Sequence, residues 1–193
     1  MKHKRILLLG DSITESFNTQ KLLSEFKIIN KGISGNNSTH LLKRLDRDLL
    51  ASNPDIVFIL IGTNDIANGF SDEKILSNIS SIIELTMTKL NDSKIFITSI
   101  LPTRDNQPRP NERIQGLNKQ VQIIAKELNV NYLNLYFLFV DETRQLIFNL
   151  TEDGLHLNNR ANFIWANILR KLLEEKLGGG IKLKLRRYDS DDL

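Results

Sequence analysis

Three short polar peptides follow apolar segments of the chain, and their residue types could do chemistry. They read Gly10-Asp11-Ser12-Ile13-Thr14, Gly32-Ile33-Ser34-Gly35-Asn36 and Gly62-Thr63-Asn64-Asp65. In an open parallel sheet, ligands bind outside the carboxyl ends of the strands, so we expect the three peptides to meet at one edge. Their backbone N–H groups would point into a concave polar pocket, which suits a developing negative charge.

Ser12 is the candidate nucleophile. A junction of a strand, Gly-Asp-Ser and a helix places this serine near a helix N-terminus, where exposed amides and the helix dipole favour an anion. The competing interpretation is that Ser12 only caps the helix, which serine does often. The choice depends on whether a base lies within hydrogen-bond reach of the hydroxyl.

That base must be one of the three histidines. His3 lies in the charged N-terminal tip, and His40 opens a predicted helix, where a capping or solvated role is favoured over chemistry. His156 stands in a turn-rich segment before the final helix, three positions after Asp153. One turn could present both side chains, so that the carboxylate fixes the imidazole tautomer. A solvated histidine on a surface turn is the competing interpretation, so the hypothesis rests on the whole set.

Strands and helices alternate along the chain in the pattern of parallel strands joined by crossover helices. The predicted strands are residues 5–9, 26–30 (near an edge), 56–61, 95–100 and 130–135. The predicted helices are residues 39–50, 72–90, 112–128 and 160–177. Ser38 is the predicted cap of the first of these helices, and Ser71 that of the second. We predict an α/β fold, a three-layer α/β/α sandwich with a flavodoxin-like parallel sheet of about five strands. The helical spacing of Trp165, Ile168, Leu169 and Leu172 predicts core residues.

Composition excludes several classes of protein. The chain has 193 residues, of which 40% are hydrophobic and 25% charged, and no cysteine, which excludes thiolate metal sites and a cysteine nucleophile. Its net charge of +3 comes from interleaved acids and bases, so we expect no nucleic-acid partner. The longest strongly apolar stretch, residues 56–61, is too short to span a membrane. The apolar stretch at residues 6–9 is too short for a signal peptide, which predicts a cytoplasmic protein.

We predict that residues 1–177 form one domain and that residues 178–193, which differ from it in sequence pattern, form an extension. Three glycines from Gly178 onward end the last helix. Apolar and basic residues then alternate over 181–186, which indicates a half-exposed strand. This C-terminal extension could be an added edge strand, an interaction arm or an unrelated remnant.

Taken together, the motifs resemble those of the SGNH, or GDSL-type, hydrolases. The resemblance rests on four blocks in the family's order and at its usual distances, and it extends from Arg5 to about Leu173. The blocks are Gly10-Asp11-Ser12, Gly32 with Gly35, Gly62-x-Asn64-Asp65 and Asp153-x-x-His156. Residues 13–14 read Ile-Thr where the family often has Leu-Ser, which should leave the chemistry unchanged.

The resemblance implies a role for each motif residue. Ser12 would attack an ester carbonyl, His156 would take its proton and later protonate the leaving alcohol, and Asp153 would orient His156. The oxyanion would be held by the backbone N–H groups of Ser12 and Gly35 and by the side-chain amide of Asn64. The two remaining carboxylates, Asp11 and Asp65, would brace the loops. No metal or organic cofactor is needed.

The family's substrates range from acetylated sugars to lysophospholipids, acyl thioesters and aryl esters. The polar segment 101–113 follows the fourth strand and should overhang the pocket, which favours a short acyl group, such as acetyl, on a polar alcohol, such as a carbohydrate. The competing interpretation is a solvated loop without substrate contact. The chain also resembles the small bacterial carbohydrate acetylesterases and the platelet-activating-factor acetylhydrolase-like members.

Other functions stay open at this point. A lysophospholipase or thioesterase would use the same residues. A flavodoxin-like protein could instead bind phosphate or FMN through Ser12, Thr14 and Ser16, and a catalytically silent module could bind a partner through residues after Gly180. The expected partner is a small-molecule ester, and the chain could form a homodimer.

Overall fold

The computed structural model describes residues 4–178 of the chain, and the predictions for His3 and for residues 179–193 lie outside that part. One parallel sheet has the strand order β2-β1-β3-β4-β5, which is the flavodoxin-like order. The strands are β1 (Arg5–Gly10), β2 (Lys27–Gly32), β3 (Ile56–Leu60), β4 (Lys94–Thr98) and β5 (Asn131–Leu133). The predicted α/β fold is confirmed, and β2 is indeed an edge strand.

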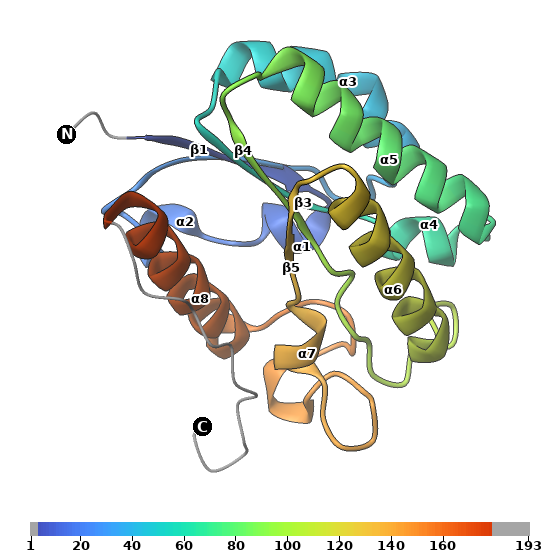
Figure 1. Ribbon diagram of the computed structural model, residues 1–193. Coiled ribbons are helices and arrows are strands. Elements are labelled where there is room, and N and C mark those ends of the chain that lie inside the picture. The colour runs from blue at the N-terminus through green and yellow to red at the C-terminus, as the bar shows by residue number, and fades with distance from the viewer. Residues whose placement is uncertain (1–3, 179–193) are drawn as a thin grey trace.

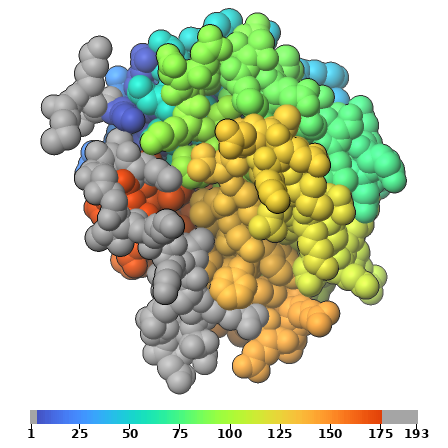
Figure 2. All heavy atoms as spheres, in the orientation of Figure 1, coloured from blue at the N-terminus to red at the C-terminus, as the bar shows by residue number. Residues whose placement is uncertain are grey.

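Helices cover both faces of this sheet (Figure 1). One side carries α3 (Ser38–Ser52), α5 (Asp72–Lys89) and α6 (Asn111–Glu127), and the other carries α1 (Ser12–Glu15), α2 (Thr19–Leu22) and α8 (Asn159–Gly178). Three short elements lie in the connections: α4 (Thr63–Ala67), α7 (Tyr136–Phe139) and the 3-10 helix η1 (Phe148–Leu150). In the space-filling view, α5 (green) and α6 (yellow) form a continuous surface that adjoins the orange segment containing α7 (Figure 2).

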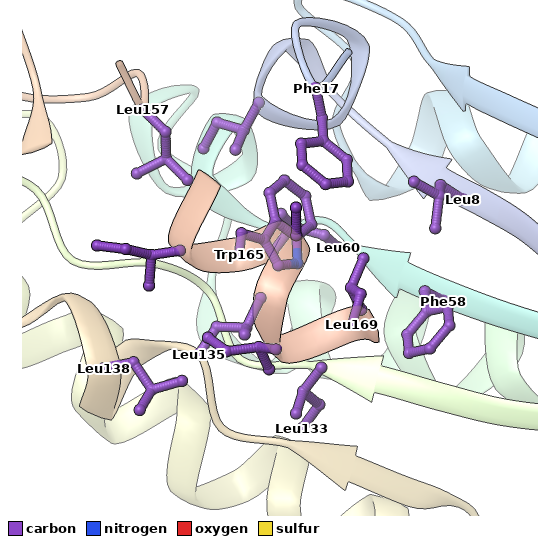
Figure 3. Close-up of a cluster of buried hydrophobic side chains, with 14 of the residues drawn as sticks. Leu8, Phe17, Phe58, Leu60, Leu133, Leu135, Leu138, Leu157, Trp165 and Leu169 are labelled. Atoms are coloured by element: carbon purple, nitrogen blue, oxygen red, sulfur yellow. The ribbon is translucent and has the colours of Figure 1, made fainter. Parts of the chain in front are cut away.

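Trp165 belongs to the core between the sheet and α8. It is 2% exposed, and its ring stacks on Phe17 with the centroids 4.3 Å apart. Leu60 and Leu169 belong to the same cluster and lie near Trp165 (Figure 3). Ile168, Leu169 and Leu172 are also buried. The helical spacing therefore predicted core residues correctly.

The main helices and strands end within a few residues of their predicted bounds. The predicted N-cap of α3 is wrong. Asn37, not Ser38, caps α3, because its side chain accepts the N–H of His40 at 3.0 Å while the Ser38 side chain bonds to Asp65. His40 Nδ1 in turn accepts the Asn37 N–H at 3.3 Å, so the capping role expected for His40 is confirmed. Within residues 4–178, no helix combines the length and the apolar character needed to cross a membrane.

Candidate active site

Ser12 is the first residue of α1, directly after β1. Asp11 is the N-cap, and its Oδ1 accepts the N–H of Ile13 at 3.0 Å. Because the aspartate caps the helix, the serine hydroxyl is left for another partner. That partner is His156, whose Nε2 lies 2.9 Å from Ser12 Oγ, although the two residues are 144 positions apart in the sequence.

His156 is held by the carboxylate of Asp153. Its Nδ1 lies 2.6 Å from Asp153 Oδ2, while Asp153 Oδ1 accepts the N–H groups of Leu155 at 2.9 Å and His156 at 2.8 Å. Partial burial raises the pKa of Asp153, but these hydrogen bonds outweigh it and lower the pKa to about 2. An ionised carboxylate only accepts, so Nδ1 carries the proton and Nε2 accepts the Ser12 hydroxyl proton.

The turn that carries Asp153 and His156 is docked on the segment after β4. Gly154 has a positive φ of 78°, and its carbonyl accepts the N–H of Arg104 at 2.7 Å. A Cβ at this position would lie 2.1 Å from the Arg104 carbonyl oxygen, so the close approach requires glycine. The Arg104 side chain bonds to the carbonyl of Leu146 at 2.6 Å and pairs with Asp141. The segment 101–113 therefore contacts the turn that carries Asp153 and His156, and its expected place over the substrate pocket stays a prediction.

The second polar peptide forms a turn whose tip is Gly35. Its φ is 73°, and no heavy atom lies within 4 Å of an added Cβ, so the left-handed backbone, not crowding, favours glycine. Glu15 of α1 accepts the N–H of Ser34 at 3.1 Å, which ties this turn to the helix that begins with Ser12.

Asn64 lies in α4 and faces the same turn. Its Nδ2 donates to the carbonyl of Asn36 at 3.0 Å, and its Oδ1 accepts from Arg109 Nη2 at 3.1 Å. Since an amide nitrogen has two N–H groups, the bond to Asn36 uses one of them. Asn64 and the turn at Gly35 are therefore brought together as expected.

Asp11 and Asp65 lie beneath this edge of the sheet. Asp65 is fully buried and accepts both the N–H and the hydroxyl of Ser38, whose oxygen also accepts from Asn78 Nδ2 at 2.7 Å. Burial raises the pKa of Asp65, with the Ser38 bonds opposing it. Burial also raises the pKa of Asp11 to about 7, against the Ile13 hydrogen bond and the charge of His156.

Sequence reasoning missed two arginines: Arg44, which connects the first two polar peptides, and Arg109, which connects the third to the segment after β4. The buried Arg44 donates to the carbonyl of Gly10 and to Asn36 Oδ1, each at 2.9 Å, and pairs with Asp48. Arg109 donates to Asn64 Oδ1. Only the spacing of Arg44 and Asp48 by four helical residues gave a signal, because the other partners lie far away in the sequence.

The three hydroxyls proposed to bind phosphate, those of Ser12, Thr14 and Ser16, each have different surroundings. Thr14 is 1% exposed, and Ser16 Oγ donates to the carbonyl of Ile13 at 3.1 Å. Only Ser12 among them contacts the imidazole. The geometry therefore gives no support to the phosphate or FMN alternative.

Comparison with known proteins identifies the family. Residues 8–162 match the family model of the GDSL-like Lipase/Acylhydrolase family. The chain belongs to this family. As a GDSL-like hydrolase it is an acyl hydrolase, and the predicted SGNH/GDSL membership is confirmed.

Its relatives include a mammalian enzyme subunit and bacterial proteins. The rat (Rattus norvegicus) platelet-activating factor acetylhydrolase IB subunit alpha1 is 25% identical over 197 residues, covering 94% of this chain and 82% of its own. A structure from Streptococcus pneumonia, provisionally described as a platelet activating factor, is 32% identical with a TM-score of 0.82 and covers 87% and 83% of the two chains. A GDSL-like lipase from Bacteroides thetaiotaomicron is 28% identical with a TM-score of 0.80, covering 91% and 90%.

Proposed function

We propose that this GDSL hydrolase is a serine esterase whose triad is Ser12, His156 and Asp153. The observation that carries the proposal is the continuous hydrogen-bonded chain from the Ser12 hydroxyl through the imidazole to the Asp153 carboxylate. Ser12 Oγ attacks the ester carbonyl as its proton passes to His156 Nε2. The imidazolium then protonates the leaving alcohol, and an acyl-enzyme remains. Water, deprotonated by His156, attacks that acyl group and releases the acid and Ser12.

In this mechanism the oxyanion binds where the three polar peptides meet. Ser12 begins α1, so its N–H has no acceptor within the helix and can donate to the oxyanion. The N–H of Gly35 and the second N–H of Asn64 Nδ2 complete the donor set. Neutral donors fixed by the fold stabilise the charge that develops on the carbonyl oxygen without reorganising during the reaction. Asp11 and Asp65 act as braces that hold these donors in place.

A short acyl group on a polar alcohol fits this site best. The side chains of His156 and Asp153 are 41% and 52% exposed, so they lie in an open part of the surface rather than in a deep apolar channel. The neighbouring segment 101–113 supplies arginine and carboxamide groups, with Arg104 and Arg109 in contact with site residues. The rat relative is named as an acetylhydrolase. We therefore propose that the substrates are acetyl esters in which the alcohol part is a carbohydrate.

The alternative within the same chemistry is a lysophospholipase or thioesterase. The two hypotheses differ in acyl chain length, so p-nitrophenyl esters from C2 to C12 should separate them when assayed beside acetylated sugars. The carbohydrate acetylesterase hypothesis predicts the highest kcat/KM at C2 and release of acetate from the sugars. A maximum at C8 or longer would contradict it.

The nucleophile is tested by Ser12→Ala. We expect this variant to lose turnover of p-nitrophenyl acetate while its thermal melt stays within about 2 °C of the wild type, because the hydroxyl contributes little to the core. Unchanged activity would exclude Ser12 as the nucleophile. Cytoplasmic location, homodimer formation and a domain boundary at residue 177 stay predictions from the sequence.

A further inference from the structure

We propose that Arg109 is a positioning residue that acts through Asn64, holding its carboxamide so that an N–H faces the oxyanion. The inference rests on the proposed esterase mechanism and extends it to a residue outside the four sequence blocks. The contacts, the chemistry of the amide and the anchoring of the arginine each support it.

The guanidinium of Arg109 binds two successive residues of α4. Its Nη2 donates to Asn64 Oδ1 at 3.1 Å, and its Nε donates to the carbonyl of Thr63 at 3.2 Å. The remaining nitrogen, Nη1, lies 3.4 Å from Asn106 Oδ1. Because the guanidinium is a planar, rigid fork of donors, these bonds fix both the position and the plane of the group.

An asparagine carboxamide has two orientations that differ by exchange of the oxygen and the nitrogen. Arg109 offers only donors, so the orientation with Oδ1 toward the arginine is the one that forms a hydrogen bond. The NH₂ group then lies on the other side, where it reaches the carbonyl of Asn36, the residue after Gly35. A cationic donor on the amide oxygen also withdraws electron density, which strengthens the N–H groups as donors.

Arg109 is itself held in place by its own segment. Its N–H donates to the carbonyl of Asn106 at 2.9 Å, and its carbonyl accepts from the buried Thr103 hydroxyl at 2.8 Å. Burial lowers the pKa of Arg109, while the carboxylates of Asp11 and Asp153 raise it. The bond to Asn64 Oδ1 directs the guanidinium toward the site, and the Arg109 side chain is partly buried there.

A competing role would be direct contact with the alcohol part of the substrate. Arg109 also lines a polar cavity of about 340 Å³ together with residues such as Asn106 and Gln145. A residue that binds the alcohol would change KM and would act whether or not Asn64 is present. A residue that acts through Asn64 would change kcat and would lose its effect when Asn64 is removed.

A double-mutant cycle separates these roles. We would measure kcat and KM on p-nitrophenyl acetate for the wild type, Arg109→Met, Asn64→Ala and the double variant, against the Ser12→Ala background rate. Arg109→Met should lower kcat roughly tenfold or more with KM within about twofold, because a charge-assisted hydrogen bond is lost. In the Asn64→Ala background the same change should alter kcat by less than about twofold. An equal loss in both backgrounds, or a change confined to KM, would overturn the proposal.

Further variants guard against a purely structural effect. Arg109→Lys keeps a positive charge and a hydrogen-bond donor group, so it should recover part of the kcat lost in Arg109→Met. If Arg109→Met fails to fold, Arg109→Lys takes its place in the cycle. Arg170→Met is the matched control, since Arg170 lies in α8, bonds Glu25 at 2.6 Å and should leave kcat unchanged. If Ser12→Ala keeps its activity, the esterase mechanism itself fails. If Ser12→Ala is inactive but the cycle is additive, only the role of Arg109 fails.

Discussion

The two sides of the site are built in opposite ways. Ser12 stands at the end of a buried strand, above Asp11 and Asp65, which are 1% and 0% exposed. His156 and Asp153 stand on an exposed turn that backbone hydrogen bonds attach to the segment after β4. The serine side is therefore part of the folded core, whereas the histidine side is a surface feature placed against it. Changes to the buried carboxylates on the serine side should therefore affect stability, whereas changes to the exposed turn should affect activity without affecting stability.

The carboxylates of the two sides differ in the same way. Burial raises the pKa of Asp11 to about 7, whereas the hydrogen bonds from His156 and Leu155 outweigh the effect of burial and lower the pKa of Asp153 to about 2. Asp153 is thus ionised throughout the neutral range and can pair with an imidazolium. The charge on Asp11, by contrast, destabilises the native state as the pH rises.

The largest effect is expected on the exposed turn. His156→Ala should lower kcat on p-nitrophenyl acetate by roughly 10⁴-fold or more, because Ser12 loses its base. Its thermal melt should stay within about 2 °C of the wild type, since the imidazole lies at the surface. A loss of activity below about 100-fold would show that another group takes the proton.

Asn64→Ala tests the serine side of the site, where Asn64 is the proposed side-chain donor to the oxyanion. Removing one oxyanion donor should lower kcat by roughly 10²–10³-fold. A loss below about threefold would exclude Asn64 from that role. Kinetics and a thermal melt of the same preparation would separate lost catalysis from lost structure.

Asp11→Asn should stabilise the protein in a pH-dependent manner. Asparagine also caps helices, and it avoids the cost of a buried charge. Because the native pKa lies above the unfolded value of 3.8, the favourable contribution of Asp11 is complete below about pH 4 and is lost as the pH rises toward 7. Denaturant unfolding should therefore show a gain of roughly 2–4 kcal/mol at pH 8 and almost none at pH 4. Equal gains at both pH values would contradict the buried-charge explanation.

Gly154→Ala tests how the turn is placed. The added Cβ would meet the Arg104 carbonyl oxygen at 2.1 Å, and φ is 78°, so the turn has to shift and carry His156 with it. A displacement of about 1 Å can cost up to about 10²-fold in rate, so we expect kcat to fall roughly 10–100-fold. Gly116→Ala in α6 is the matched control, because no atom lies within 4 Å of its Cβ, and it should keep full activity. Full activity of Gly154→Ala would show that this contact does not place His156.

The fold and the meeting of the sequence blocks could be predicted because both depend on local patterns. Apolar β-branched runs and helical spacing gave the five strands and four long helices, and polar residues directly after strands marked the edge of the sheet. Short helices such as α2 and α7 have only four residues, which is too few for a periodic signal. The strand at Asn131–Leu133 is shorter than the predicted 130–135 because the chain turns into α7 at Asn134, whose Oδ1 accepts the N–H of Phe137 at 3.1 Å.

The supporting contacts could not be predicted because they depend on tertiary packing. Asn37 and Ser38 are both good N-caps, and the buried Asp65, 27 positions away, decides between them by bonding Ser38. Arg109 meets Asn64 across 45 positions, and neither residue type specifies the other as its partner. The sequence therefore predicts which candidate site residues meet better than it predicts which residues hold them in place.

The most direct test of the central claim is covalent labelling with a fluorophosphonate. We expect one label per chain, on Ser12 by peptide mass spectrometry, with activity lost in proportion to labelling. In His156→Ala the labelling rate should fall steeply, because the hydroxyl is no longer activated. Inactivation with the label on another residue, or full activity in protein labelled on Ser12, would contradict a nucleophilic Ser12 paired with His156.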